Sequence, residues 1–152
     1  MELLWTRLDG RSGHDAAYEL LSQLVSPLPD IRKTERGKPY FVGCDLHFSV
    51  SHSQNHAFCA VSRKNLGIDA EEMTRNVDLR LAKRILSPTE MRRLEATPDK
   101  QAALLRLWVL KEAYGKLTGK GWGNYLQETD FDPFDPRIQI IDGCYVATLT
   151  DK

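Results

Sequence analysis

Hydrophobic positions in the first half of the chain change from a helical repeat to an alternating one. Between residues 15 and 25 apolar side chains recur every three or four positions, which predicts a helix that Pro27 cannot continue. Residues 46–51 alternate between apolar and polar side chains, and residues 57–61 form a second apolar run after the polar turn SHSQN. This pattern predicts an antiparallel hairpin.

The second half has the pattern of helices followed by strands. Residues 77–86 are amphipathic, residues 87–90 have the form of a helix capping box, and Thr97 and Pro98 open a long helix that ends near Thr118. Gly119 supplies the stop. Three later segments are expected to be strands, with Asp142 and Gly143 joining the last two: residues 130–134, 137–141 and 144–149.

The order of these elements predicts an α+β fold in one domain. With 152 residues, 41% of them hydrophobic, the chain is long enough for one sizeable core. A helix and strands come first, and a strand, helices and strands follow, so we expect two halves that meet near residue 65. The basic segment 30–39 is expected to be an exposed loop between helix and hairpin.

Charge and cysteine content narrow the classes of function. The 21 basic and 21 acidic residues cancel, so no global field favours nucleic acid or a membrane, and any anion site must be local. Three cysteines without a CxxC pair argue against a disulfide framework or a zinc site, and a reducing cytoplasm is expected. The charged N-terminal stretch is expected to be neither a signal peptide nor a membrane span.

Asp69 and Glu71 are the first candidates for chemistry. Residues 66–71 alternate, which predicts a strand with an apolar core face and both carboxylates on the opposite, acidic face. Two residues apart on a strand, the carboxylates lie about 6 to 7 Å from each other at Cα. A hard divalent ion such as magnesium offsets their repulsion. A solvated strand face is the alternative interpretation.

The long helix offers a third carboxylate. Trp108, Glu112 and Lys116 are each four residues apart and share one helix face. This face carries a negative and a positive side chain, so it can contact both a cation and an anion. An ordinary surface ion pair between Glu112 and Lys116 is the alternative. Gly115 costs about 1 kcal/mol relative to alanine within a helix, which the close approach of a ligand would explain.

A second cluster follows the first hairpin strand. Ser51, His52 and Ser53 combine hydroxyls, an imidazole and turn amides that suit a phosphate, although a serine-rich turn is equally ordinary. Basic residues of segment 30–39 precede that strand and include Lys38. The remaining histidines and Cys59 lack a recognisable ligand spacing, so structural roles are expected for them, His56 included.

Two motifs together resemble the paired signature of the 4′-phosphopantetheinyl transferases. They are GIDAE at residues 67–71 and WVLKEAYGK at residues 108–116. Four further segments appear in the family's order: GKP at 37–39, FSVSHS at 48–53, LSPTE at 86–90 and GKG at 119–121. In the distance of Asp69 from the N-terminus, the chain resembles the long, surfactin-synthetase-activating type. It would be a short member of that type.

The resemblance implies roles for particular residues. Asp69, Glu71 and Glu112 match the family's ligands of magnesium, with manganese as the other candidate ion. Lys38, Ser51 and His52 match contacts to the phosphates of coenzyme A, and Lys116 matches the pyrophosphate contact. Contacts to the 3′-phosphate are expected from Arg11, with Arg7 and His14 as further candidates.

The resemblance also implies a fold and a reaction. Pseudo-repeats 1–65 and 66–152 would form two pseudo-symmetric halves of a monomer, each with a small antiparallel sheet and a helix. The reaction would move phosphopantetheine from coenzyme A to a serine of an apo acyl or peptidyl carrier protein, giving 3′,5′-ADP. Glu112 is the candidate base, directly or through a water that Glu90 helps to orient, and Lys116 would stabilise the departing phosphate.

Two other functions are weighed against this transfer. The same carboxylates and lysine could activate water in a magnesium-dependent phosphoesterase that hydrolyses coenzyme A. A non-catalytic module that binds a carrier protein is the second alternative.

Overall fold

The computed structural model describes residues 1–121 and 124–152, in which the first half of the chain forms a three-stranded sheet and a hairpin. In the sheet, the antiparallel order is β1-β5-β4, and β2 pairs with β3. Helix α1 begins where the Ser12 side chain accepts a hydrogen bond from the Asp15 N–H. The elements are β1 (Glu2–Arg7), α1 (Gly13–Leu24), β2 (Ile31–Lys33), β3 (Pro39–Phe41), β4 (His47–His52) and β5 (His56–Ser62).

The second half forms another antiparallel sheet, in the order β6-β8-β7, with its helices between β6 and β7 in the chain. In both sheets the strand that comes last in the chain, β5 or β8, is the central strand. The elements are β6 (Leu66–Glu72), the 3-10 turn η1 (Leu79–Leu81), α2 (Ala82–Ile85), α3 (Pro88–Glu95), α4 (Lys100–Thr118), η2 (Asn124–Glu128), β7 (Ile138–Ile141) and β8 (Cys144–Thr150).

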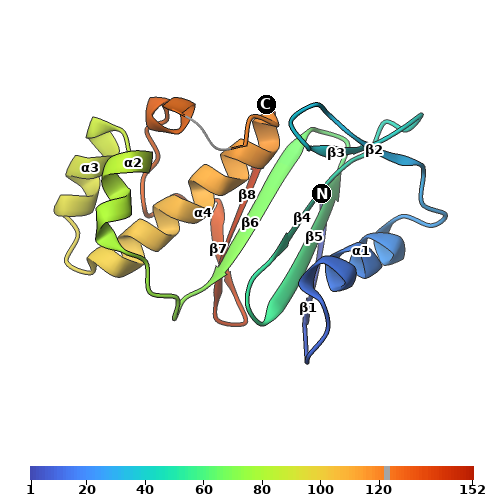
Figure 1. The fold of residues 1–152 in the computed structure, drawn as a ribbon, viewed down its shortest axis with the longest axis horizontal. Helices are drawn as coiled ribbons and strands as arrows, with labels where there is room; N and C mark the ends of the chain where they lie inside the picture. Colours follow the sequence, from blue (N-terminus) through green and yellow to red (C-terminus); the bar gives the residue numbers. More distant parts are fainter. Residues whose placement is uncertain (122–123) are drawn as a thin grey trace.

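Three apolar cores separate the layers (Figure 1). One core lies between α1 and the first sheet, and another lies between the second sheet and helices α2 to α4. The third joins the two halves, because Phe58 and Ala60 of β5 pack with Ile68 of β6 and Val146 of β8. Successive residues of β5 thus face different cores, and both sides of the strand are buried.

Serine hydroxyls connect β4 to β6 where no strand pairing does so. Ser49 Oγ accepts a hydrogen bond from the Ile68 N–H at 3.0 Å, and Ser51 Oγ accepts one from the Ala70 N–H at 3.1 Å. Both hydroxyls therefore satisfy buried backbone donors along the edge of β6. The seam between the halves combines these bonds with the shared core.

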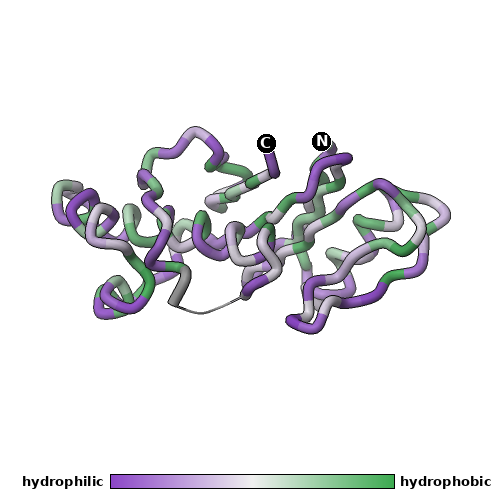
Figure 2. The backbone as a smooth tube through the Cα atoms, turned by 90° about the horizontal axis from the view of Figure 1, so that it is seen from above, coloured by the Kyte–Doolittle hydropathy of each residue, from purple (hydrophilic) through white to green (hydrophobic). Residues whose placement is uncertain are grey.

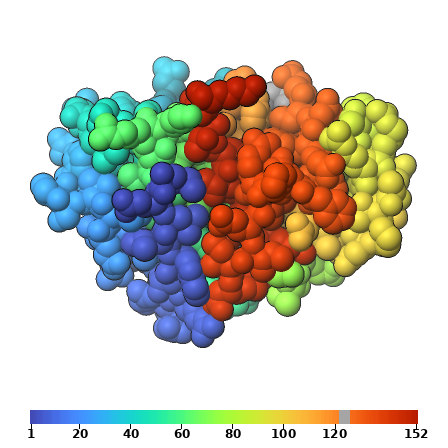
Figure 3. Space-filling view, turned by 180° about the vertical axis from the view of Figure 1, so that it is seen from behind, coloured from blue at the N-terminus to red at the C-terminus, as the bar shows by residue number. Residues whose placement is uncertain are grey.

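Both ends of the chain lie near the middle of the long axis, where the sheets meet (Figures 1 and 2). The N-terminal strand and the C-terminal hairpin form adjoining surfaces on the back of the molecule (Figure 3). An ion pair between Arg7 and Asp142 at 2.7 Å joins these two segments. None of the described helices is long and apolar enough to cross a membrane.

The expected α+β class, the helix in residues 15–25, the hairpin, the strand from residue 66, the capping box and the final hairpin are confirmed. The long helix begins slightly later than expected, with Asp99 as its N-cap, and Gly119 ends it with a φ of 74°. Residues 77–86 fold as the turn η1 and the short helix α2 rather than one continuous helix.

Two other predictions of secondary structure were wrong, and one strand was missed. Strand β1 was not expected, and segment 30–39 contributes β2 and the start of β3 rather than a loop alone. Residues 130–134 are not a strand, because side chains of α3 bind their backbone: Arg93 donates to the Asp130 and Phe131 carbonyls, and Glu90 accepts from the Phe131 N–H.

Candidate functional site

The face of β6 that carries the candidate carboxylates lies against α4. A Cβ atom added at Gly67 would lie 2.0 Å from the Ala113 carbonyl oxygen and 2.4 Å from the Leu117 nitrogen. Only a residue without a side chain lets the strand and the helix backbones approach this closely. The alternative interpretation of a solvated strand face therefore does not hold at Asp69, which is 7% exposed.

Asp69 is a buried carboxylate with one unused oxygen. Its Oδ1 is 3.2 Å from Lys116 Nζ and accepts a hydrogen bond from Ser51 Oγ at 3.3 Å. Its Oδ2 has no hydrogen-bond partner among the described residues. Burial raises the pKa of Asp69, and the Lys116 charge opposes that shift. An unpartnered buried oxygen of this kind is a natural ligand for a cation.

Glu71 is half-buried and forms an ion pair with Arg75, four residues further along the chain. Burial raises the pKa of Glu71, which Arg75 partly opposes and the nearby Asp69 charge reinforces. The Arg75 guanidinium also lies 5.7 Å from the centre of the Trp108 ring. This contact ties the end of β6 to the middle of α4.

Where the chain from β6 onward meets α4, residues later in the first segment contact residues earlier in the helix. Asp69 meets Lys116, and Arg75, further along the chain, meets Trp108, further back on the helix. Glu112 lies midway between Trp108 and Lys116 on the same helix face, so it is level with the stretch of chain that contains Glu71. The three carboxylates predicted as metal ligands are thus placed along one strand–helix interface.

This interface fits a hard divalent cation by its donors. All three groups are carboxylates, and Asp69 Oδ2 is unused. In the structure, Asp69 is turned to Lys116 and Glu71 to Arg75, so these cations balance the acidic groups. The described three-residue group whose ligand atoms lie within 4.8 Å of one another is a different one, His56, Glu72 and Cys144.

A cavity of about 180 Å³ opens beside this interface, between α4 and strands β3 and β4. Three predicted residues line it: Lys38, Glu112 and Lys116. The buried Gly115 also lines it. The remaining walls come from Arg36, Gly37, Pro39, Phe48, Ser49, Val50, Lys111, Gly119, Gly121 and Leu126.

Lys38 and Ser51 also hold the structure together. Lys38 Nζ donates to Asn65 Oδ1 at 2.6 Å and to the Leu117 carbonyl at 2.8 Å, near the end of α4. Burial lowers the pKa of Lys38. Ser51 is 4% exposed, and its hydroxyl is engaged by Ala70 and Asp69. Both residues therefore shape the cavity wall or the strand beneath it, whatever else they bind.

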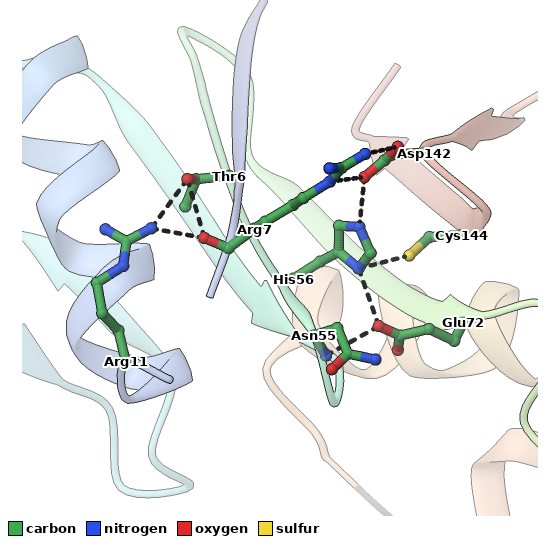
Figure 4. A network of polar contacts seen from close by, with 8 residues as sticks. All are labelled: Thr6, Arg7, Arg11, Asn55, His56, Glu72, Asp142 and Cys144. Atoms are coloured by element: carbon green, nitrogen blue, oxygen red, sulfur yellow. Dashed lines mark hydrogen bonds and ion pairs between the residues drawn. The ribbon is translucent and has the colours of Figure 1, made fainter. Parts of the chain in front are cut away.

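His52 and Arg11 line other cavities. His52 packs over the start of α1, where a Cβ at Gly13 would lie 2.5 Å from the imidazole, and it shares a cavity with Glu71 and Arg75. Arg11 donates to the Arg7 carbonyl at 2.6 Å (Figure 4) and to the Leu8 carbonyl at 2.9 Å. Arg11 lines a third cavity, so the structure does not bring it to the cavity of Lys38 and Lys116.

Sequence reasoning missed a buried ion pair at the wall of the cavity. Lys111 is 1% exposed and pairs with Glu90, which is fully buried. Glu90 also accepts hydrogen bonds from the N–H groups of Ser87 and Phe131, so the capping box is confirmed within a larger network. Spacing could have revealed Lys111, because it continues the buried helical series of Leu104 and Leu107.

Comparison with known proteins identifies relatives across most of the chain. Residues 65–146 match the family described as the 4′-phosphopantetheinyl transferase superfamily. A 4′-phosphopantetheinyl transferase of Bacillus subtilis is 44% identical over 123 residues, which cover 75% of this chain and 54% of that protein. The transferase AcpT of Salmonella typhi is 35% identical over 140 residues, 89% of this chain and 71% of that protein.

The transferase Sfp of Bacillus subtilis strain 168 is 40% identical over 90 residues, 57% of this chain and 40% of that protein. The predicted resemblance to the surfactin-synthetase-activating type is confirmed by these matches. The chain spans about half the length of the Bacillus relative matched over 123 residues, and less of Sfp.

Proposed function

Because this chain belongs to the 4′-phosphopantetheinyl transferase superfamily, we propose that it transfers 4′-phosphopantetheine from coenzyme A to a serine of an apo acyl or peptidyl carrier protein. The observation that carries the proposal is Asp69. Its buried carboxylate has an unpartnered oxygen beside Lys116, next to a cavity that Lys38 and Glu112 also line. Carboxylates that can bind a cation and lysines that can bind phosphate therefore lie next to one another.

In this proposal Asp69, Glu71 and Glu112 hold magnesium, with manganese as the other candidate. The orphaned Asp69 Oδ2 and the place of Glu112 in the wall of the adjoining cavity support this assignment. When bound, the ion would neutralise charge on the pyrophosphate of coenzyme A, which is the help that phosphoryl transfer chiefly needs. Occupation of this interface by a cation would relieve Lys116 and Arg75 of balancing the acidic groups.

Lys116 then serves the substrate. Its ammonium is only partly buried and lies at the cavity wall, within reach of an anion that enters there. Lys38 contributes a second positive charge to the same cavity, and His52 and Arg11 are assigned to phosphates further along coenzyme A. Ser51 supports the site through Asp69 as well as through its assigned phosphate contact.

The transfer requires a proton acceptor. The serine oxygen of the carrier forms a bond to the β-phosphorus, the bond between that phosphorus and the bridging oxygen breaks, and 3′,5′-ADP leaves. Glu112 accepts the serine proton, directly or through water, and passes it to solvent. Glu90 has no part in this step, because its carboxylate is occupied by Lys111, Ser87, Thr129 and Phe131.

The proposal extends to architecture and setting. Residues 1–152 would be one domain made of pseudo-repeats 1–65 and 66–152, and the matching strand orders β1-β5-β4 and β6-β8-β7 support this division. We assign a monomer in a reducing cytoplasm, with a carrier protein and coenzyme A as its partners. Three free cysteines are consistent with that compartment.

Intact-protein mass spectrometry tests the reaction directly. An apo acyl carrier protein is incubated with this protein, coenzyme A and Mg²⁺, beside an EDTA control and the Asp69→Asn variant. We expect the carrier to gain the mass of one phosphopantetheine arm, and the gain to disappear in both controls. Cleavage of coenzyme A without a carrier would indicate a phosphoesterase, and no change across several carriers would leave a binding module.

A further inference from the structure

A second group of metal-ligating side chains lies where the two halves meet, on the side away from the α4 cavity. His56 begins β5, Glu72 ends β6 and Cys144 begins β8 (Figure 4). The ligand atoms of these three residues all lie within 4.8 Å of one another. His56 Nδ1 is 2.9 Å from Glu72 Oε1 and 3.4 Å from Cys144 Sγ.

We propose that His56 Nδ1, Glu72 Oε1 and Cys144 Sγ bind a zinc ion that joins the two halves of the molecule. One nitrogen, one oxygen and one sulfur donor suit zinc and exclude a preference for magnesium, which binds oxygen. The cysteine pattern argued against a zinc site, but that argument considers only cysteines that are paired in the sequence. The proposal therefore departs from it. The three ligands here come from positions 56, 72 and 144, so no local spacing announces them.

The distances are close to those of a tetrahedral site. Zinc bonds of about 2.0 to 2.3 Å place neighbouring ligand atoms about 3.3 to 3.6 Å apart. The separation of 3.4 Å between His56 Nδ1 and Cys144 Sγ already meets this requirement. The separation of 2.9 Å between His56 and Glu72 must widen by about half an ångström, which rotation of the glutamate side chain supplies.

Each of two ligands is held by a second partner. His56 Nε2 is 2.8 Å from Asp142 Oδ2, and Arg7 fixes that aspartate with hydrogen bonds of 2.7 and 2.9 Å. A carboxylate on the far ring nitrogen orients a histidine ligand and leaves the near nitrogen for the metal. Glu72 accepts hydrogen bonds from the N–H groups of Asn55 at 2.9 Å and Gln54 at 3.1 Å.

Ser53 provides an independent observation at the same place. It is 7% exposed, and among the described residues its hydroxyl is a buried group without a hydrogen-bond partner. Its side chain lowers the pKa of Glu72 and opposes the rise in the pKa of Cys144, which places it beside these two ligands. Ser53 and Glu72 line one open cavity, which gives a metal ion a path to the group and leaves room for a water as fourth ligand.

The charges around the group suit a cation. Burial lowers the pKa of His56, but the carboxylates that face both of its ring nitrogens raise it overall. Burial raises the pKa of Cys144 to about 11, which keeps the thiol neutral. Binding of zinc would displace the proton of the Cys144 thiol and any proton on His56 Nδ1, because metal ligands bind in their deprotonated form.

The ion would add a metal link between two sheets that already meet through a shared core and hydrogen bonds. His56 belongs to the first sheet, whereas Glu72 and Cys144 belong to the second. Glu72 directly follows Glu71, so a metal there also fixes the end of the strand that carries the proposed magnesium ligands. The proposal does not depend on the transferase function.

Metal analysis of the untagged full chain tests the site. The protein is loaded with Zn²⁺, dialysed and analysed by plasma mass spectrometry, and a parallel sample is loaded with Co²⁺ for absorption spectroscopy. We expect one zinc per chain and a thiolate-to-cobalt charge-transfer band. Cys144→Ser should lose the band and the bound zinc, whereas Cys44→Ser and Asp69→Asn should keep both, because neither residue contributes a ligand here.

Asp142→Asn is the sharper test, because it leaves all three ligands in place. Asn accepts the left-handed conformation that residue 142 adopts, with φ at 46°, so the turn should be retained. Loss of the carboxylate on His56 should weaken zinc binding about 10- to 100-fold. Zinc that is absent from the wild-type protein, or a cobalt band that persists in Cys144→Ser, would overturn the proposal.

Discussion

Glu112 is the single residue on which the proposed transfer depends most directly. It lines the α4 cavity together with Lys38 and Lys116, and it lies on the helix face that meets β6. Its carboxylate has two assigned tasks, holding the cation and accepting the serine proton. Glutamine keeps the shape of the side chain but removes both the charge and the basicity.

We therefore expect Glu112→Gln to lower turnover at least about a hundredfold, the lower range for a positioned acid–base group. The measurement is the rate of carrier modification at saturating coenzyme A, beside a thermal unfolding curve that should hardly change. Glu95→Gln, at the exposed end of α3, is the matched control and should retain full activity. Near-normal turnover would remove Glu112 from the mechanism.

At the scale of single residues, the sequence identified candidate site residues better than it predicted what surrounds them. Asp69 and Lys116 were recognised from their motifs, and the structure brings them together. The burial of Asp69 and the attachment of Ser51 to the Ala70 N–H depend on how β4 and α4 pack around β6. Those contacts join residues far apart in the chain, so no local pattern reveals them. The metal and phosphate roles stay predictions.

At the scale of elements, the closest approach is between β6 and α4 at Gly67. An added Cβ would lie 2.0 Å from a backbone oxygen, so the helix would have to move away from the strand. We expect Gly67→Ala to lower the free energy of unfolding by about 1 to 3 kcal/mol or more, as overpacking does. Urea unfolding followed by circular dichroism measures the loss.

Gly10→Asn is the control for this substitution. Gly10 has open space around its Cβ position, and asparagine tolerates its positive φ of 86° better than most residues do. A smaller loss is expected than at Gly67. Equal losses at both sites would mean that backbone conformation, and not the contact with α4, decides the cost.

The buried pair of Lys111 and Glu90 links α4 to α3. Lys111→Met leaves the Glu90 carboxylate buried without its cation, which should cost about 3 to 5 kcal/mol of unfolding free energy. Adding Glu90→Gln removes that charge and retains the capping box, so the double variant should recover much of the loss.

The double-mutant cycle separates this charge effect from lost packing. Lys64→Met, at an exposed position, should change stability by no more than about 0.5 kcal/mol. If the double variant is as unstable as Lys111→Met, the loss comes from packing around residue 111 and the ion pair contributes little.

Elements with strong local signals were predicted, and those set by distant partners were not. Helix α3 was recognised from its capping box and α4 from its length and terminal Gly119. Strand β1 is short, and its pairing with β5 joins residues 49 to 59 positions apart, so its sequence alone gave a weak signal. Residues 130–134 resembled a strand, but α3 supplies their hydrogen-bond partners.

At the scale of the whole molecule, the two sheets share a core and should unfold together. Phe58 and Ala60 from the first half are fully buried against Ile68 from the second, so separating the halves would expose all three. The boundary expected near residue 65 falls between β5 and β6. The apolar run at residues 57–61 does not show which segments cover the two faces of β5, so the sequence did not reveal the core that the sheets share.

A single cooperative transition is therefore the expectation, and Ser49→Ala probes the seam within it. Without the Ser49 hydroxyl the buried Ile68 N–H loses its partner, at a cost of about 1 to 3 kcal/mol. Variants that keep only Trp5, in the first half, or only Trp108, in the second, report each half by fluorescence in urea. Both reporters should shift to lower urea equally, and Ser62→Ala, whose hydroxyl bonds an exposed N–H, should shift them little. Separate midpoints for the two reporters would instead mean that each sheet and its helix is stable alone, with the serine bonds joining two independent units.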